Sequence, residues 1–562
     1  MVLLFYLDSI FIFLFSCLLP VNNFNGLSCV SCVLGITLSF VSFFFTHKFI
    51  KTKTLKHLAI IQKISEYFPY LSISFFIMSR VHAKSGLYVL DMILALYWIF
   101  IVVYNQIILF RLNPKRIKKY FDDIPEPDEK KKRSLLFGII DWADAILQAA
   151  CIVLLFNVFI LQLYIIPSES MVSEFMVNDR VMGLKISAGP TFPLSSFRFP
   201  QIHKYQRGDV VIIRHPHYKD EPYNDLKFLT SQFIQMMTLT MVNINKDQNG
   251  NIKPDPLVKR IVGMGGEKVM LVDGKLYIKK KGEADFNLFD ESAYAKWDLS
   301  KLPKTELQYV QEIKVKPVEL EKLESVESWR SAVDFEEAIK EAEHLIKKMK
   351  EIKGKPDTVF SAKDFLNKGQ YLINNMAKDN DVISAKILTT NGGLIWFENF
   401  LTGWKSAVDK NKKDYNLYEL RNAQLNVLIK LAFGKLFIRN AELYKENSSE
   451  EKFVNDKERQ NIINELEDYI FYLMWSRQRN MNEFPEEDEY IPDDAYFMMG
   501  DNRFNSTDMR HQYNPHLESL CEKDPYTIMF ITNVKPQYIK SSQMLGTVNL
   551  ILFPFSRFGK IN

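Results

Sequence analysis

Cysteine is scarce in this chain, which has five cysteines among its 562 residues. Four of them lie in apolar segments and Cys521 stands alone, so neither a disulfide framework nor a zinc site is indicated. Cys29 and Cys32 match the pattern C-x-x-C, but their apolar surroundings favour two small membrane residues over a redox pair. The sequence therefore predicts no metal site and no cofactor.

An excess of one sign of charge is also missing. The chain has 71 basic and 67 acidic residues, which leaves a formal net charge of +4. Proteins that bind nucleic acid normally concentrate basic charge on one face, so we expect no nucleic-acid partner. The chain is long enough for more than one domain, and its first third is apolar whereas residues 282–490 are rich in Lys, Glu, Asp and Asn.

Long apolar runs are what the first third does contain. About 20 residues are needed to cross a bilayer. Four runs approach that length at residues 2–19, 27–45, 87–110 and 145–166, and a weaker fifth run covers residues 67–78. The first run lacks the charged start and the small-x-small end of a signal peptide, so we interpret it as a retained helix.

Basic residues between these runs predict the orientation. Lysines and arginines gather in residues 47–63 and 111–133, and such loops usually stay in the cytoplasm. An even number of crossings must separate two cytoplasmic loops, which favours the weak run as a true span. The prediction is five spans, with the N-terminus inside and everything after Ile166 outside.

The remainder reads as a mainly antiparallel β domain interrupted by an α-helical insertion. β-branched strands are expected near residues 210–214 and 257–263, and a hairpin with an Asp273-Gly274 turn follows. Helical periodicity then dominates, with charged faces that are most simply solvated surfaces, although partner binding stays open. The expected divisions are a multi-span membrane region with cytoplasmic basic loops (1–135), a last transmembrane helix (136–166), the β domain (167–281 and 491–562) and the α-helical insertion (282–490).

Ser170 directly follows the last apolar run, in the segment Pro167-Ser168-Glu169-Ser170-Met171. A serine so close to a membrane exit would meet substrates whose reactive bond lies near the bilayer. A nucleophilic serine needs a base, and the histidines beyond residue 166 stand in no recognisable triad context.

Lys259 is the alternative base. It lies within a predicted strand next to Arg260, so the two side chains point to opposite faces. Arginine stays protonated, but a lysine becomes a base when burial lowers its pKa from about 10.4 by roughly three units. The competing interpretation is a lysine at a strand edge whose charged head reaches water.

A third segment runs from Gly500 to Arg510 and follows another predicted strand. It is dense in hydrogen-bonding groups, and a hydroxyl such as that of Ser506 could hold the lysine amine in place. The alternative is a well-bonded structural turn.

Together, four blocks of this sequence resemble the bacterial type I signal peptidases, also called leader peptidases. The blocks are Pro167-Ser168-Glu169-Ser170-Met171, Arg207-Gly208-Asp209-Val210-Val211, Val258-Lys259-Arg260-Ile261-Val262-Gly263, and Gly500-Asp501-Asn502-Arg503 with Ser506, Asp508 and Arg510. They occur in the family's order, and they cover only the β portion of the chain.

The resemblance implies a serine endopeptidase with a Ser/Lys dyad of Ser170 and Lys259. Ser168 and the N–H of Ser170 would form the oxyanion hole, and Ser506 would orient the lysine. Supporting salt bridges would come from Arg260, Asp501, Asp508 and Arg510. The implied substrates are signal peptides of exported preproteins, cleaved after small-x-small sequences outside the bacterial cytoplasmic (inner) membrane by a multi-pass protein in contact with the lipid bilayer.

Some residues depart from the family's pattern. Glu169 replaces the usual small residue between the serines, and Val172-Ser173-Glu174 replaces a Met-x-Pro-Thr-Leu continuation. None of these changes removes a group that the chemistry needs. Two alternatives remain: a soluble self-cleaving Ser/Lys protease of the repressor type, which would lack the membrane spans, and a catalytically silent membrane scaffold that recruits partners through the insertion.

Aromatic residues near the β domain raise one more question. Phenylalanines in residues 191–200 and 553–558 could dip into the bilayer interface, but ordinary core packing is the safer expectation for Phe.

Overall fold

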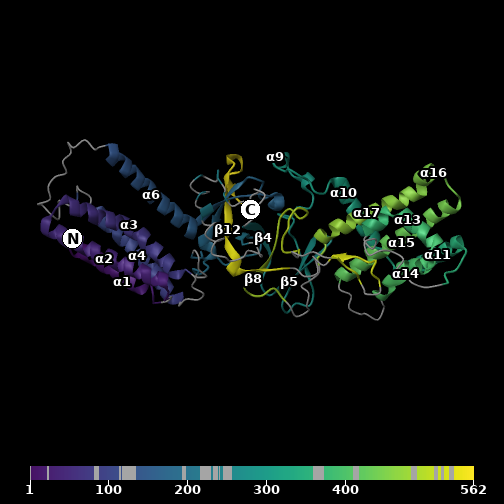
Figure 1. Cartoon of the computed structure of the whole chain (residues 1–562), viewed down its shortest axis with the longest axis horizontal. Helices are drawn as coiled ribbons and strands as arrows, with labels where there is room; N and C mark the ends of the chain where they lie inside the picture. The colour runs from purple at the N-terminus through teal and green to yellow at the C-terminus, as the bar shows by residue number, and fades with distance from the viewer. Residues whose placement is uncertain are drawn as a thin grey trace.

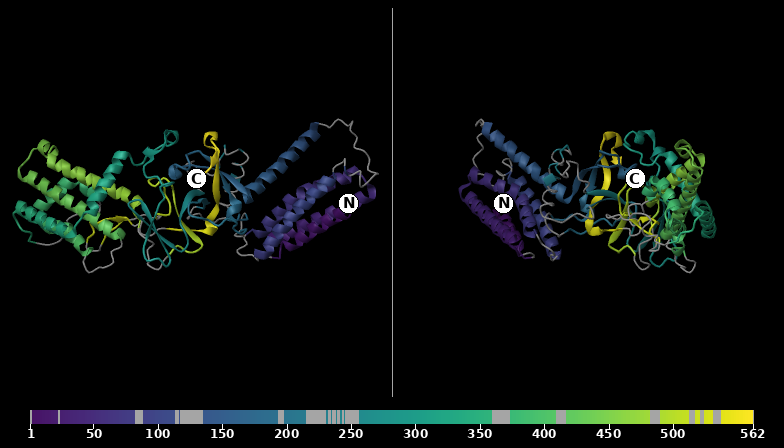
Figure 2. Two further views of the ribbon diagram at one scale, coloured as in Figure 1. Left: turned by 180° about the vertical axis from the view of Figure 1, so that it is seen from behind. Right: turned by 45° about the vertical axis from the view of Figure 1, so that its right-hand side comes forward.

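Figure 1 shows three parts along the long axis of the chain: apolar helices at one end, a β-sheet in the middle and a helical body at the other end. The same order is visible from behind (Figure 2). This computed structural model describes residues 2–21, 24–81, 88–112, 116, 135–192, 198–214, 256–358, 373–408, 417–481, 490–511, 517–520, 524–530 and 537–561, with isolated positions between 230 and 244.

Four of the apolar helices pack side by side: α1 (Val2–Leu18), α2 (Gly26–Thr52), α3 (Leu55–Arg80) and α4 (Tyr88–Leu112). Arg80 and Asp91 form a buried ion pair of 2.6 Å between the end of α3 and the start of α4. A fifth helix, α6 (Leu135–Phe159), meets α3 where Lys63 and Tyr67 contact Asp144. None of the 18-residue apolar window of this helix is buried within the described residues, although Val158 and Phe159 at its end are packed against neighbouring residues.

Within the described residues, three helices are long and apolar enough to cross a membrane, at Gly26–Thr52, Val89–Leu112 and Gly138–Phe159. The apolar part of α1, Leu3–Leu18, is shorter. The weak run at residues 67–78 is helical within α3, but that helix is not among the candidate spans. The five-span topology therefore stays a prediction. Most of the basic segment 111–133, on which its orientation partly depends, lies outside the described residues.

The prediction of a last transmembrane helix over residues 136–166 is wrong at the C-terminal end of that range. α6 stops at Phe159, and β1 (Leu161–Ile165) pairs antiparallel with β2 (Arg180–Leu184). Alternate residues of β1 are buried, and the pairing satisfies their backbone groups. A buried strand is as apolar as a membrane helix, so hydrophobicity alone could not separate the two. Ser170 is thus joined to the membrane helix through a strand of the sheet.

The β-sheet has the strand order β1-β2-β12-β3-β4-β8-β11, with β13 beside β12, and the neighbouring strands are antiparallel. The further bounds are β3 (Val210–Ile213), β4 (Leu257–Gly263), β8 (Ala495–Met499), β11 (Ile539–Lys540), β12 (Met544–Phe553) and β13 (Gly559–Lys560). Chain segments on both sides of the insertion therefore meet in one sheet, because β4 pairs with β8.

The predicted hairpin is confirmed. β5 (Glu267–Val272) pairs with β6 (Lys275–Lys280), and β7 (Asn287–Phe289) extends the ribbon. Asp273 and Gly274 both have positive φ, of 51° and 75°, as a two-residue turn of this kind requires. A small separate ladder joins β9 (Leu517–Glu518) and β10 (Met529–Phe530).

The helical body is built around α15 (Leu417–Lys445), which contacts most of its other helices. These helices are α10 (Pro317–Ser331), α11 (Phe335–Lys353), α12 (Ile373–Lys378), α13 (Asn380–Thr389), α14 (Gly393–Thr402), α16 (Glu450–Val454) and α17 (Lys457–Arg479). The body is not self-contained, because its core also includes Phe504, Tyr526 and Ile528 from beyond residue 490. Trp396 Nε1 donates to the Tyr526 hydroxyl at 2.8 Å.

Residues 290–316, which we call the strap, connect β7 to α10. The strap contains only short elements, η2 (Leu299–Lys301) and α9 (Lys304–Leu307). Its apolar residues Leu299 and Leu302 pack against Val172 and Met176, just beyond Ser170. The region 282–490 therefore includes, besides the helices, a segment that belongs to the surroundings of the site.

Two of the phenylalanines pack against the apolar helices. The ring of Phe192 lies 4.8 Å from that of Phe76 and 5.2 Å from that of Phe159, and Phe199 joins the same group. Core packing is thus the outcome for these two, while residues 193–197 lie outside the described residues. Phe555 and Phe558 differ, because they are 82% and 60% exposed.

Candidate active site

Residues 166–176 form a segment that we call the nucleophile loop, and its short 3-10 helix η1 (Glu169–Met171) carries Ser170 beside the sheet. Ile166 and Met171, before and after the serine, are buried among residues of β2, β3 and β12. This packing anchors the loop, and it leaves Ser170 partly exposed and Ser168 exposed. The nucleophile candidate is therefore held by a rigid support yet accessible from solvent.

Lys259 contacts Ser170 from strand β4 of the same sheet. It lies in β4 opposite Val211 of β3, and its Nζ donates a hydrogen bond to Ser170 Oγ at 2.9 Å. The lysine is 3% exposed. Two residues separated by 89 positions in the sequence are thus in direct contact.

Burial lowers the pKa of Lys259 to about 8. The nearby carboxylates of Asp508 and Asp501 raise the pKa, whereas the charge of Arg510 lowers it. About a tenth of such a group is neutral at pH 7. The lysine therefore has both the position and the protonation behaviour of a general base.

Arg260 points to the opposite face of β4, as alternation requires. Its guanidinium binds Asp501 through two nitrogens, at 2.8 and 2.9 Å, and also contacts Glu174 at 3.0 Å. It donates to the carbonyl of Gly208 at 2.9 Å. This ion pair links β4 to the loop after β8, and Glu174 links both to the segment after Ser170.

Asp508 and Arg510 form a second buried pair. Arg510 donates to both carboxylate oxygens, at 2.8 and 3.0 Å, and Asp508 also accepts the N–H of Gly500 at 2.9 Å. Burial opposes the charged form of Asp508, but the guanidinium of Arg510 holds the pKa of that carboxyl well below its usual range. The loop after β8 therefore keeps its shape through its own charges.

Sequence reasoning assigned no role to Asn502 and Gly500, which this loop brings against the nucleophile. The N–H of Asn502 donates to the carbonyl of Ser170 at 3.1 Å. A Cβ at Gly500 would lie 2.4 Å from the same carbonyl and 2.2 Å from Ser506 Oγ, so only glycine fits. The density of turn residues was a signal for a bonded loop, but not for its partner.

Of the two serines expected to support the dyad, Ser506 does not bond to the lysine and Ser168 makes only a long contact with Ser170. Ser506 is buried, but its hydroxyl has no hydrogen-bond partner among the described residues, so the bond to Lys259 is not formed here. Ser168 Oγ donates to Ser170 Oγ at 3.4 Å. The hydroxyl of Ser168 is therefore close to the nucleophile and free to turn toward another acceptor.

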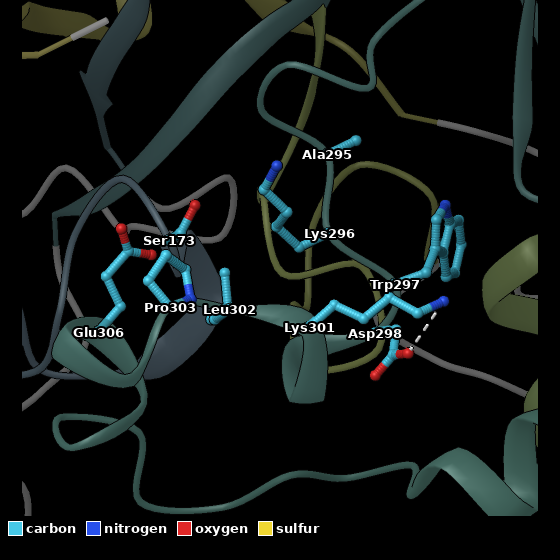
Figure 3. Close-up of a pocket in the computed structure, with 9 residues that line it drawn as sticks. All are labelled: Ser173, Ala295, Lys296, Trp297, Asp298, Lys301, Leu302, Pro303 and Glu306. Atoms are coloured by element: carbon cyan, nitrogen blue, oxygen red, sulfur yellow. Dashed lines mark ion pairs between the residues drawn. The ribbon is translucent and has the colours of Figure 1, made fainter.

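A cavity of about 410 Å³ lies beside the nucleophile loop. Figure 3 shows that Ser173 lines one side of it and that the strap supplies the rest. Lys301 and Asp298 form an ion pair of 3.3 Å at its edge. Neither Ser170 nor Lys259 lines this cavity, so it is separate from the dyad. Among the described residues, no three His, Cys, Asp or Glu side chains gather as a metal site would require.

Comparisons with known proteins agree with the geometry. A family model described as "Signal peptidase, peptidase S26" matches residues 139–380 and 429–552, more than half of the chain. The chain is 27% identical over 146 residues to a protein named "Signal peptidase I" from Rickettsia bellii (strain OSU 85-389), a match covering 25% of this chain and 38% of the relative. Proteins of the same name from Rickettsia massiliae (strain Mtu5) and Rickettsia prowazekii (strain Madrid E) are 26% and 24% identical over 139 residues, covering 23% of this chain and 40% of each relative. The chain thus spans about two fifths of the length of these curated relatives.

Proposed function

The chain belongs to the signal peptidase family, peptidase S26, and on that premise we propose that it removes N-terminal signal peptides from exported preproteins. The observation that carries this proposal is the hydrogen bond of 2.9 Å between Lys259 Nζ and Ser170 Oγ. A membrane protein of this family with a serine beside a buried lysine has the parts of a serine endopeptidase.

The proposed reaction starts from neutral Lys259. As Ser170 Oγ attacks the scissile carbonyl carbon, the lysine takes its proton, and the carbonyl oxygen becomes an oxyanion. The ammonium then donates that proton to the leaving amine as the C–N bond breaks, which leaves an ester on Ser170. Water, deprotonated by the again neutral lysine, attacks the ester carbon. The C–O bond to Ser170 Oγ then breaks, the lysine ammonium returns the proton to that oxygen, and the signal peptide leaves with its new carboxyl group.

Two serines have proposed supporting roles. The hydroxyl of Ser168 and the N–H of Ser170 would donate to the oxyanion, which requires Ser168 Oγ to turn away from its contact of 3.4 Å with Ser170. Ser506 would accept from the ammonium form of Lys259, and its hydroxyl is not engaged by another described residue. Arg260, Asp501, Asp508 and Arg510 would act by holding these segments together.

The substrate would approach from the membrane side. The three candidate membrane spans among the described residues precede the sheet, and the last of them, α6, continues into β1 and the nucleophile loop. We propose that the sheet lies outside the bacterial cytoplasmic membrane and that the signal peptide binds as an added strand, with small residues before the scissile bond. Signal peptides and the bilayer would then be its partners.

The decisive experiment is a cleavage assay on a model preprotein with the full chain in detergent. Ser170→Ala and Lys259→Ala should each abolish cleavage, because one lacks the nucleophile and the other the base. Lys275→Ala, which removes an exposed lysine of β6, serves as the matched control and should cleave normally. Near-normal activity of Lys259→Ala would show that another group is the base. A silent scaffold would cleave nothing even as the wild type, and the short Lys259–Ser170 distance does not favour it.

A further inference from the structure

A buried carboxylate lies between the two serines of the nucleophile loop. Glu169 is only 6% exposed, whereas Ser168 and Ser170 on either side reach solvent. Burying a charged group is costly unless it is well bonded. Among the described residues, no lysine or arginine pairs with this carboxylate, and its partners are N–H groups instead.

Those N–H groups come mainly from the strap. Glu169 Oε1 accepts the backbone N–H groups of Gln311 and Glu312, the second at 3.3 Å. Its Oε2 accepts from Asn505 Nδ2 at 3.4 Å. One carboxylate therefore joins the nucleophile loop to the strap and to the loop after β8. Hydrogen bonds to a charged acceptor are about twice as strong as neutral ones.

The main chain of the nucleophile loop is held by the loop after β8. Asn502 Nδ2 donates to the carbonyl of Glu169 at 3.0 Å, and the Asn502 N–H donates to the carbonyl of Ser170. The following residues, Val172 and Met176, pack on Leu299 and Leu302 of the strap. Side-chain, main-chain and apolar contacts thus fix one short segment.

The strap is itself firmly attached at both ends. Glu291, near its start, forms a bidentate ion pair with Arg503, at 2.7 and 2.8 Å. Near its end, Val315 is part of the core of the helical body. The strap therefore connects the folded insertion to the residue that precedes the nucleophile.

We propose that Glu169 is a positioning residue through which the strap sets the place of Ser170 Oγ relative to Lys259 Nζ. This inference rests on the proposed function. η1 is a single turn, so a shift of Glu169 moves the adjacent serine directly. A misplacement of about 1 Å in a reacting group can cost about 100-fold in rate. The role predicts an effect on the chemical step and little effect on substrate binding.

The test compares full-chain variants in the preprotein cleavage assay, with kcat expressed per folded, monodisperse protein. Glu169→Ala removes the acceptor, and we expect kcat to fall by about 30- to 100-fold while KM changes by less than about threefold. Glu169→Gln keeps one oxygen for the two strap N–H groups, so its kcat should lie between those of the wild type and the alanine variant.

A matched control lies on the strap itself. Glu312→Ala removes an exposed carboxylate but keeps the N–H that binds Glu169, so its kcat and KM should equal those of the wild type. If Glu169→Ala folds poorly, Glu169→Gln decides, and a wild-type kcat in that variant would overturn the proposal. A wild-type kcat in Glu169→Ala, or a rise in KM without loss of kcat, would overturn it as well. Failure of the wild type to cleave preprotein would instead refute the proposed function.

Discussion

The pH dependence of cleavage follows directly from the surroundings of Lys259. The perturbation is a change of pH from 6 to 10, with kcat/KM measured on a peptide substrate that has no titrating group in this range. Only the neutral amine acts as a base, and burial lowers its pKa to about 8. We therefore expect kcat/KM to rise with pH and to level off above about pH 9.

The size of the rise in kcat/KM with pH distinguishes a lysine of lowered pKa from an ordinary one. With a pKa of about 8, the neutral fraction rises about tenfold between pH 7 and pH 9. A lysine at its usual value of about 10.4 would instead give a rise of nearly 100-fold, with no levelling before pH 10.

Enzyme returned from each pH to pH 8 should regain full activity, which separates titration from denaturation. A profile that is flat between pH 6 and 8, or one that still rises tenfold per unit above pH 9, would refute the assignment of Lys259 as a desolvated base.

Two further predictions concern stability and membrane contact. Lys259→Met should raise the free energy of unfolding at pH 7 by up to roughly 3 kcal/mol, because the folded state no longer holds an ammonium whose pKa it lowers from 10.5 to about 8. The cost of that ammonium is fully present below pH 8 and disappears as pH rises toward 10.5, so the stability gap between variant and wild type in denaturant titrations should narrow over this range; a gap independent of pH would contradict the reasoning. The double variant Phe555→Ser, Phe558→Ser should cleave preprotein more slowly than the wild type when both are reconstituted in liposomes. Both rings are largely exposed, so they are available to contact the bilayer. The buried Phe192→Ser should act instead through loss of folded protein, and unchanged activity on liposomes for the exposed pair would argue against membrane contact there.

Much of the candidate site was visible as separate blocks of sequence. Ser170, Lys259 and the loop from Gly500 to Arg510 were each identifiable, because a nucleophile and its base require particular side chains and a bonded turn requires particular residue types. The alternation of strand residues also predicted that Lys259 and Arg260 face opposite ways, as they do.

Other features depended on contacts between distant segments. The last part of the apolar run 145–166 forms β1 because β2 is present to pair with it. The expected bond from Ser506 to Lys259 is not formed, although the serine is buried beside Gly500. The core of the helical body includes Tyr526 and Ile528, which no pattern within residues 282–490 could reveal.

The sequence by itself determined the chemistry of this protein: a serine, a lysine that burial can neutralise, a polar loop and a set of apolar helices. Local residue types carry that information, because they specify which groups can donate, accept or avoid water. Only the tertiary structure decided that Glu169, the odd residue between two serines, bonds to a strap that begins about 120 residues later in the chain. Its role depends on which distant N–H groups fold against it, and no local pattern encodes that.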